Sequence, residues 1–246
     1  MIDDFTLACG VDIPFRDAAL TIHNPSLKEL SILGLDGMMQ AINIFNFTKE
    51  KFIDKDKINL INQSDFDIFM SIMCVPDESL ESIREKIYLL SAILFPNYTC
   101  EFTPTAIILT SLDRKEVKFI NEINFSVFKQ ILSDIFCLNR KGETDDKNYN
   151  PQGKLATNIA KKLEERKKKL SQIKKDRGEK EDNVFKRYIF NLSVGLKIDI
   201  NVVTSWTLYQ FYEELDKFQK KESYDMYIDA KLAGASGMKD VDNWML

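Results

Sequence analysis

The sequence has 246 residues, a length typical of one or two domains. Its 34 Lys and Arg residues stand against 38 Asp and Glu residues, and the formal net charge of -4 excludes a protein that coats nucleic acid with its whole surface. With 9 Gly and 6 Pro, the chain has too few turn formers for a loop-rich all-β protein, so composition favours helix.

The sequence contains four widely spaced cysteines, Cys9, Cys74, Cys100 and Cys137, without a Cys-x-x-Cys pair. A zinc or redox site needs closely spaced ligands, and His23 is the single histidine of the chain. We therefore expect no metal site and no cofactor. We interpret the cysteines as reduced, mostly buried thiols of a cytoplasmic protein, and His23 as a turn or strand-end residue.

No part of the sequence predicts a membrane segment. The N-terminus begins acidic and lacks the basic and apolar regions of a secretory signal. The longest apolar stretch, residues 87–95, is far shorter than the ~20 residues that a helix needs to cross a bilayer.

Charge divides the chain into three parts. Residues 1–139 carry a net charge of -8, residues 140–181 of +6 and residues 182–246 of -2. We predict an α+β N-terminal domain, a polar linker with a basic helix, and a C-terminal helical module, with these boundaries.

Four helices are predicted before residue 96. The first spans about residues 25–33, with Asn24 as its cap and Gly34 at its end, and Asp36 caps the second. Ser64 and Asp67 have the spacing of a capping box ahead of the third. The fourth follows the acidic residues 77–78 and ends near residue 95. Their apolar positions recur at helical spacing. They include Met38, Met39, Ile42, Phe45, Phe66, Phe69, Met70, Met73, Leu80, Ile83, Ile87, Leu90 and Leu94.

A β-hairpin is predicted from Thr105–Thr110 and Glu116–Ile120, because both runs are rich in β-strand formers. A lone hairpin is only marginally stable, so we expect a further strand from Ala18–Ile22. Asn124 or Ser126 then caps a helix with apolar residues at Phe125, Phe128, Ile131, Leu132 and Ile135.

Residues 154–180 form a predicted basic helix with eleven basic and four acidic side chains. We interpret it as a solvated connecting helix, because its apolar stripe is narrow. Two alternatives remain: contact with an acidic protein surface and contact with nucleic acid. Salt-dependent DNA binding that is lost on neutralising residues 167–169 would identify the second. The electrostatic surface we single out is Lys161, Lys162, Arg166, Lys167, Lys168, Lys169, Lys174 and Lys175.

Three helices are predicted in the C-terminal module. The first spans residues 184–192 and ends at Gly195, and the second begins at Thr204 or Ser205 and runs to Phe218. The third spans residues 224–232 and ends in the small residues that follow. The chain is thus predicted as α+β and predominantly α-helical, with a small antiparallel β-hairpin in the first part and a C-terminal helical bundle.

Aromatic residues of this module extend beyond one helical stripe. Trp206, Tyr209 and Tyr212 lie off the apolar face of the second helix, so they are either buried on two sides of the bundle or bind a partner helix or a second copy. Trp244 is either docked on the bundle or a partner anchor. These four residues are our candidates for partner binding.

The two ends of the chain resemble a family of small proteins from tailed phages and prophages of low-GC bacteria. The C-terminal resemblance lies in residues 205–215 (SWTLYQFYEEL), 224–225 (YD), 230–235 (AKLAGA) and 242–245 (DNWM). The N-terminal resemblance lies in residues 24–34 (NPSLKELSILG), where a Pro-led short helix precedes a Gly.

Such proteins resemble phage tail assembly chaperones, which bind the tape-measure protein and keep it soluble. The resemblance implies that role here, in the host cytoplasm, with the tape-measure protein as partner. The α+β first part and the basic helix depart from the shorter chaperones, so a structural component of the tail or its attachment region, present in the virion, is the alternative. No set of nucleophile, base and orienting group points to an enzyme.

Overall fold

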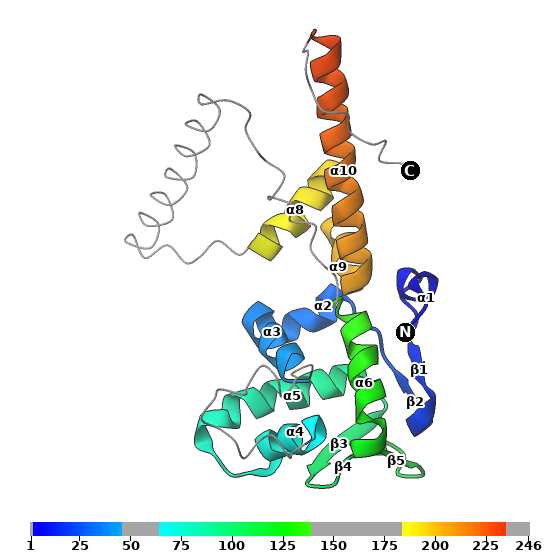
Figure 1. Ribbon diagram of the computed structural model, residues 1–246, viewed down its shortest axis with the longest axis vertical. Helices are drawn as coiled ribbons and strands as arrows, with labels where there is room; N and C mark the ends of the chain where they lie inside the picture. The colour runs from blue at the N-terminus through cyan, green and yellow to red at the C-terminus, as the bar shows by residue number, and fades with distance from the viewer. Residues whose placement is uncertain (1, 46–63, 139–183, 235–246) are drawn as a thin grey trace. The chain divides into compact units, whose positions relative to one another are not determined.

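A computed structural model describes residues 2–45, 64–138 and 184–234 (Figure 1). The elements of residues 2–45 are α1 (Asp4–Ala8), β1 (Ile13–Phe15), η1 (Arg16–Ala18), β2 (Leu20–Ile22), α2 (Leu27–Leu30), η2 (Ser31–Leu33) and α3 (Gly34–Phe45). Those of residues 64–138 are α4 (Asp65–Cys74), η5 (Glu78–Leu80), α5 (Glu81–Leu94), β3 (Tyr98–Thr103), β4 (Ala106–Ser111), β5 (Val117–Ile120) and α6 (Glu122–Ile135). The last range holds α8 (Val184–Leu196), α9 (Ile200–Ser205) and α10 (Leu208–Leu232). The chain is α+β and predominantly helical, which confirms the predicted fold class.

The described residues 2–138 and 192–234 belong to one compact unit, and residues 184–191 belong to a second. The predicted boundaries at residues 139–140 and 181–182 lie outside the described residues. The division of the chain into three parts therefore stays a prediction.

The strands of the described residues form two separate antiparallel sheets. The predicted hairpin is β4 and β5, in which Ile107 is paired with Ile120. Its third strand is β3, which sequence analysis missed and which a tight turn folds back onto β4, with Thr103 opposite Ala106. The strand expected within residues 18–22 forms as β2, but it pairs with β1 instead of the hairpin. The expected pairing partner was wrong, because β-strand propensity predicts where a strand forms but not which strand it pairs with.

A cluster of buried phenylalanines forms the core between the helices and the three-stranded sheet. Its members are Phe15, Phe45, Phe69, Phe95, Phe125 and Phe128. The ring centroid of Phe128 on α6 lies 5.8–6.2 Å from those of four other members, the rings on β1, α3 and α6 and at the end of α5. Aromatic pairs at such distances add to the free energy of area burial, so α6 is the central helix of this core.

Four helices of this unit begin with a capping box, in which the cap side chain and the third helical residue bond each other's backbone N–H. Ser64 and Asp67 form the predicted one at α4. The caps of the other three are Ser26 at α2, Asn121 at α6 and Thr207 at α10.

The expected caps of these three helices were wrong. Asn124 is the third residue of the box of α6, while Thr204 and Ser205 lie in α9 and bond back to carbonyls of that helix. The Asn24 side chain is buried and has no partner among the described residues. When several Ser, Thr and Asn residues adjoin, the reciprocal partner three positions later identifies the cap.

The C-terminal end of α4 is capped by a side chain from α5. The guanidinium of Arg84 donates hydrogen bonds to the carbonyl oxygens of Ile72, at 2.7 Å from Nε, and of Val75 and Asp77. The Ile72 carbonyl is one of the last four of α4, which have no partner within the helix, and the guanidinium both satisfies it and opposes the negative end of the helix dipole. The contact joins α4 to α5.

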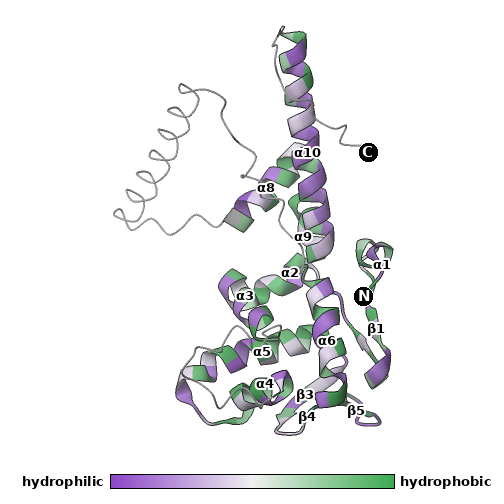
Figure 2. Cartoon of the chain, in the orientation of Figure 1, coloured by the Kyte–Doolittle hydropathy of each residue, from purple (hydrophilic) through white to green (hydrophobic). Residues whose placement is uncertain are grey.

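Two expectations for the C-terminal helices were wrong. The predicted second and third helices are one helix, the 25-residue α10, along which hydrophilic residues are frequent (Figure 2). Gly195 does not end the first helix but lies inside α8, where a Cβ atom would stand 2.4 Å from the ring of Phe218 on α10. The glycine therefore permits close approach of two helices, and the left-handed residue that follows α8 is Lys197.

Candidate protein-docking groove

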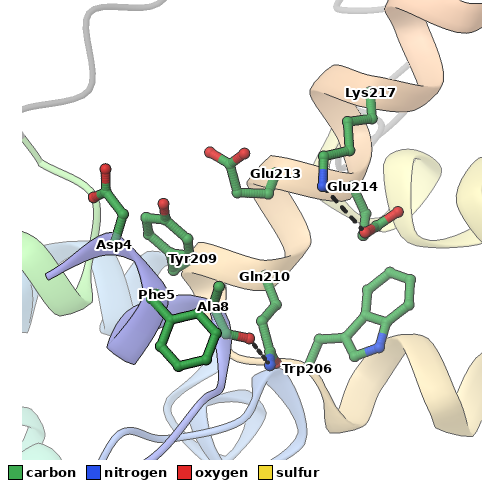
Figure 3. Close-up of a pocket in the computed structure, with 9 residues that line it drawn as sticks. All are labelled: Asp4, Phe5, Ala8, Trp206, Tyr209, Gln210, Glu213, Glu214 and Lys217. Carbon is green, nitrogen blue, oxygen red and sulfur yellow. Dashed lines mark hydrogen bonds and ion pairs between the residues drawn. The ribbon is translucent and has the colours of Figure 1, made fainter. Parts of the chain in front are cut away.

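An open pocket of about 420 Å³ lies between α1 and the first turns of α10 (Figure 3). We call it the α1/α10 groove. Its lining residues are Asp4, Phe5, Ala8, Trp206, Tyr209, Gln210, Glu213, Glu214 and Lys217. The volume falls in the lower part of the roughly 300–1,000 Å³ range of ligand pockets, so it suits side chains of a partner better than a whole helix.

The residues of α10 that line the groove are held by the start of that helix. Trp206 lies between α9 and α10, and its carbonyl oxygen accepts a hydrogen bond from the Leu27 N–H of α2 at 2.8 Å. Thr207 caps α10 and pairs with Ser26 in an isolated β-bridge. The start of α2 thus fixes the backbone from which the Trp206 indole projects.

The other wall, α1, is tied to α10 by Gln210. Its amide Nε2 donates to the carbonyl oxygen of Ala8 at 2.8 Å, while its Oε1 accepts from the Thr207 N–H at 2.9 Å. Gly10 follows α1 with φ +65°, and a Cβ atom there would lie 2.9 Å from Nε2 of Gln210. The backbone angle favours glycine, and a side chain at this position would have to displace the amide of Gln210. At the other end of α1, the Ile2 N–H donates to Asp134 Oδ2 at 3.1 Å.

Aromatic and acidic side chains dominate the lining. Phe5 is 75% exposed, while Trp206 and Tyr209 are half-buried. Three carboxylates, on Asp4, Glu213 and Glu214, stand against one ammonium, on Lys217, so the lining carries a formal charge of -2. Lys217 Nζ lies 3.9 Å from Glu214 Oε1, both exposed to solvent, and such a pair contributes little free energy.

The structure brings two of the four candidate partner-binding residues together. Trp206 and Tyr209 both line the groove, whereas the half-buried Tyr212 ring packs edge-on against Phe211 with centroids 5.6 Å apart. Trp244 and the eight candidate basic residues lie outside the described residues. Sequence analysis missed Phe5 and Asp4, which no local pattern links to residues 200 positions away. It also missed Glu213 and Lys217, although they lie at helical spacing from Tyr209 and Gln210.

A histidine with two carboxylate partners adjoins the start of α2. Nδ1 of His23 lies 2.7 Å from Asp12 Oδ1, and Nε2 lies 3.1 Å from Glu29 Oε1. Partial burial lowers the pKa of His23, but hydrogen bonds to and attraction by Asp12 and Glu29 outweigh it and raise the pKa above its ordinary value. Burial likewise opposes ionisation of Glu29, yet the hydrogen bonds from Ser26 and His23 hold its pKa below the ordinary value. The charged forms of His23 and Glu29 are therefore favoured.

The four cysteines, all within the described residues, form no disulfide, but the expectation that most of them are buried was wrong. Cys9 is exposed, and the other three are intermediate in exposure. Burial raises the pKa of the Cys100 thiol to about 12, so it stays protonated at neutral pH. Within the described ranges, no cluster of three or more His, Cys, Asp or Glu residues is placed to hold a metal ion. No helix in those ranges is long and apolar enough to span a bilayer.

The C-terminal part of the chain is similar to a phage-associated domain family. The family is the YomV second domain, and the match covers residues 179–246. These residues include α8, α9 and α10 and therefore one wall of the α1/α10 groove. Neither the search of curated proteins nor that of solved structures finds a match to the chain.

Proposed function

We propose that this chain is a phage tail morphogenesis protein that acts by protein–protein binding, as an assembly chaperone for the tape-measure protein. The observation that carries the proposal is the α1/α10 groove, where Trp206 and Tyr209 stand beside the exposed Phe5. Aromatic side chains in a partly buried concavity are common anchors of protein interfaces. The work would be done in the host cytoplasm, before the tail is complete.

The lining of the groove favours protein binding at this site over catalysis or nucleic-acid binding. The groove lining contains no Ser, Cys or His side chain to serve as nucleophile or base beside its carboxylates, and its formal charge of -2 repels phosphate. The similarity of residues 179–246 to a phage-associated family and the resemblance of both chain ends to tail assembly chaperones supply the phage context.

The test is affinity purification of the chain from phage-infected or prophage-induced cells, with mass spectrometry of the bound proteins and of purified particles. Recovery of the tape-measure protein in the cell fraction, with the chain missing from particles, is the expected result. Stoichiometric presence in particles would make the chain a structural component of the tail or its attachment region instead.

The role of the groove is tested with Trp206→Ala and Tyr209→Ala in the same purification. Tyr224→Ala is the matched control, because Tyr224 is a half-buried aromatic residue outside the groove on α10, the helix that carries Tyr209. We expect the two groove variants to lose the partner and the control to retain it. Full recovery by both groove variants would refute the groove as the docking site. Circular dichroism of each variant checks that α10 is still folded.

A further inference from the structure

The carboxylates of the α1/α10 groove surround its aromatic side chains. In the view of Figure 3, Asp4 on α1 and Glu213 on α10 lie on either side of the hydroxyl end of Tyr209, and Glu214 lies toward Trp206. The acidic groups thus come from both walls, and the apolar surface of Phe5 and Trp206 lies below them. A ligand in the groove meets rings and negative charge together.

This combination selects the chemistry of an occupant. An ammonium or guanidinium group is attracted both by the faces of Trp and Tyr rings and by carboxylates, whereas a phosphate or carboxylate is repelled. The rings also bury the methylene stem of a Lys or Arg side chain and an adjacent apolar side chain. The carboxylates repel an acidic peptide and the phosphates of a nucleic acid.

We infer that the groove binds a basic amphipathic segment of a protein partner, which places a Lys or Arg side chain among Asp4, Glu213 and Tyr209 and an apolar side chain against Phe5 and Trp206. The inference rests on the proposed function in one respect only, namely that the groove docks protein. It adds the chemical class of the segment, and it predicts that binding weakens as salt screens the carboxylates.

Trp206 supplies a direct probe of this contact, because the chain has only two tryptophans, Trp206 and Trp244. In a Trp244→Phe background, tryptophan fluorescence reports on the groove alone. The titrant is a synthetic helical peptide with leucines at i, i+3, i+4 and i+7 and arginines beside them. A second peptide carries citrulline, which is neutral and nearly isosteric, in place of every arginine.

We expect the arginine peptide to change Trp206 fluorescence with a dissociation constant about tenfold lower than that of the citrulline peptide, with a difference that shrinks at high salt. Asp4→Asn combined with Glu213→Gln should remove most of that difference. Asp225→Asn, which deletes a carboxylate of α10 outside the groove, is the control and should retain it.

Equal affinity for the two peptides, or an equal loss in the Asp225→Asn control, would overturn the inference while leaving the groove as a docking site. If neither peptide changes Trp206 fluorescence but Trp206→Ala still loses the tail protein in cells, the inference also falls and the proposed function stands. Tighter binding of single-stranded DNA than of either peptide would overturn both.

Discussion

Substitution of Gly195 by alanine has two opposing effects on stability: alanine has the higher helix propensity, but its Cβ atom clashes at the contact between α8 and α10. Alanine favours a helix interior over glycine by about 1 kcal/mol, and by less near a helix end. Gly195 is the second-last residue of α8, so propensity alone predicts a gain in stability of at most about 1 kcal/mol.

The effect of the substitution on packing lowers stability, opposite to the effect of helix propensity. A Cβ atom at Gly195 would lie 2.4 Å from both Cε2 and Cζ of Phe218, whereas carbon atoms in contact prefer roughly 3.5–4.0 Å. One of the two groups must move by more than about 1 Å, and overpacking of this kind costs about 1–3 kcal/mol. We therefore expect Gly195→Ala to lower the free energy of unfolding by about 1 kcal/mol overall.

The assay is urea unfolding followed by circular dichroism, in a double-mutant cycle with Phe218→Ala. Removing the ring removes the clash, so Gly195→Ala should stabilise the Phe218→Ala protein by a few tenths of a kcal/mol up to about 1 kcal/mol. A stabilising effect of the same size in both backgrounds would refute the steric explanation and return Gly195 to an ordinary helix position.

Three further predictions use the same unfolding assay. His23→Gln should lower the free energy of unfolding most between about pH 4.5 and 6.5, which are the ordinary pKa values of Glu and His. The pKa of His23 is raised, so its stabilising contribution is lost as the pH rises above this window. The pKa of Glu29 is lowered, so its contribution is lost as the pH falls below the window. A pH-independent cost would contradict this. Phe128→Ala should cost about 3–5 kcal/mol, whereas the exposed Phe5→Ala should change stability by less than about 0.5 kcal/mol; comparable losses would refute the placement of the core. Arg84→Met should lower the free energy of unfolding by about 1–2 kcal/mol, because it frees the carbonyl of Ile72 in α4 and those of Val75 and Asp77 after it, and an unchanged midpoint would argue against that cap.

Local sequence signals located most helices of the first part of the chain. Ser64 and Asp67 form the predicted box, and the predicted apolar residues of α4 and α6 are buried. Capping and helical periodicity depend on residues three or four positions apart, so they can be recognised without the rest of the fold. The same signals failed where several capping residues adjoin, because the choice among them depends on one reciprocal bond.

The groove was only half predictable. Trp206 and Tyr209 stood out because they lie off the apolar face of their helix, and the structure places both in the groove. Phe5 and Asp4 gave no signal, since a five-residue helix near the N-terminus has no pattern that identifies its partner. The roles of Trp244 and of the basic residues at 161–175 stay predictions, because these residues lie outside the described ranges.

The sequence by itself determined the α+β, mainly helical class, the hairpin of β4 and β5, and the positions of most helices in the first part of the chain. Tertiary structure decided which strands share a sheet, that Gly195 serves close packing instead of ending a helix, and that α1 meets α10 through Gln210 and Ala8. The physical reason is the separation along the sequence over which each kind of interaction acts. Propensity and capping act within one turn of helix, whereas strand partners and helix contacts are selected by the fit of surfaces that are distant in sequence.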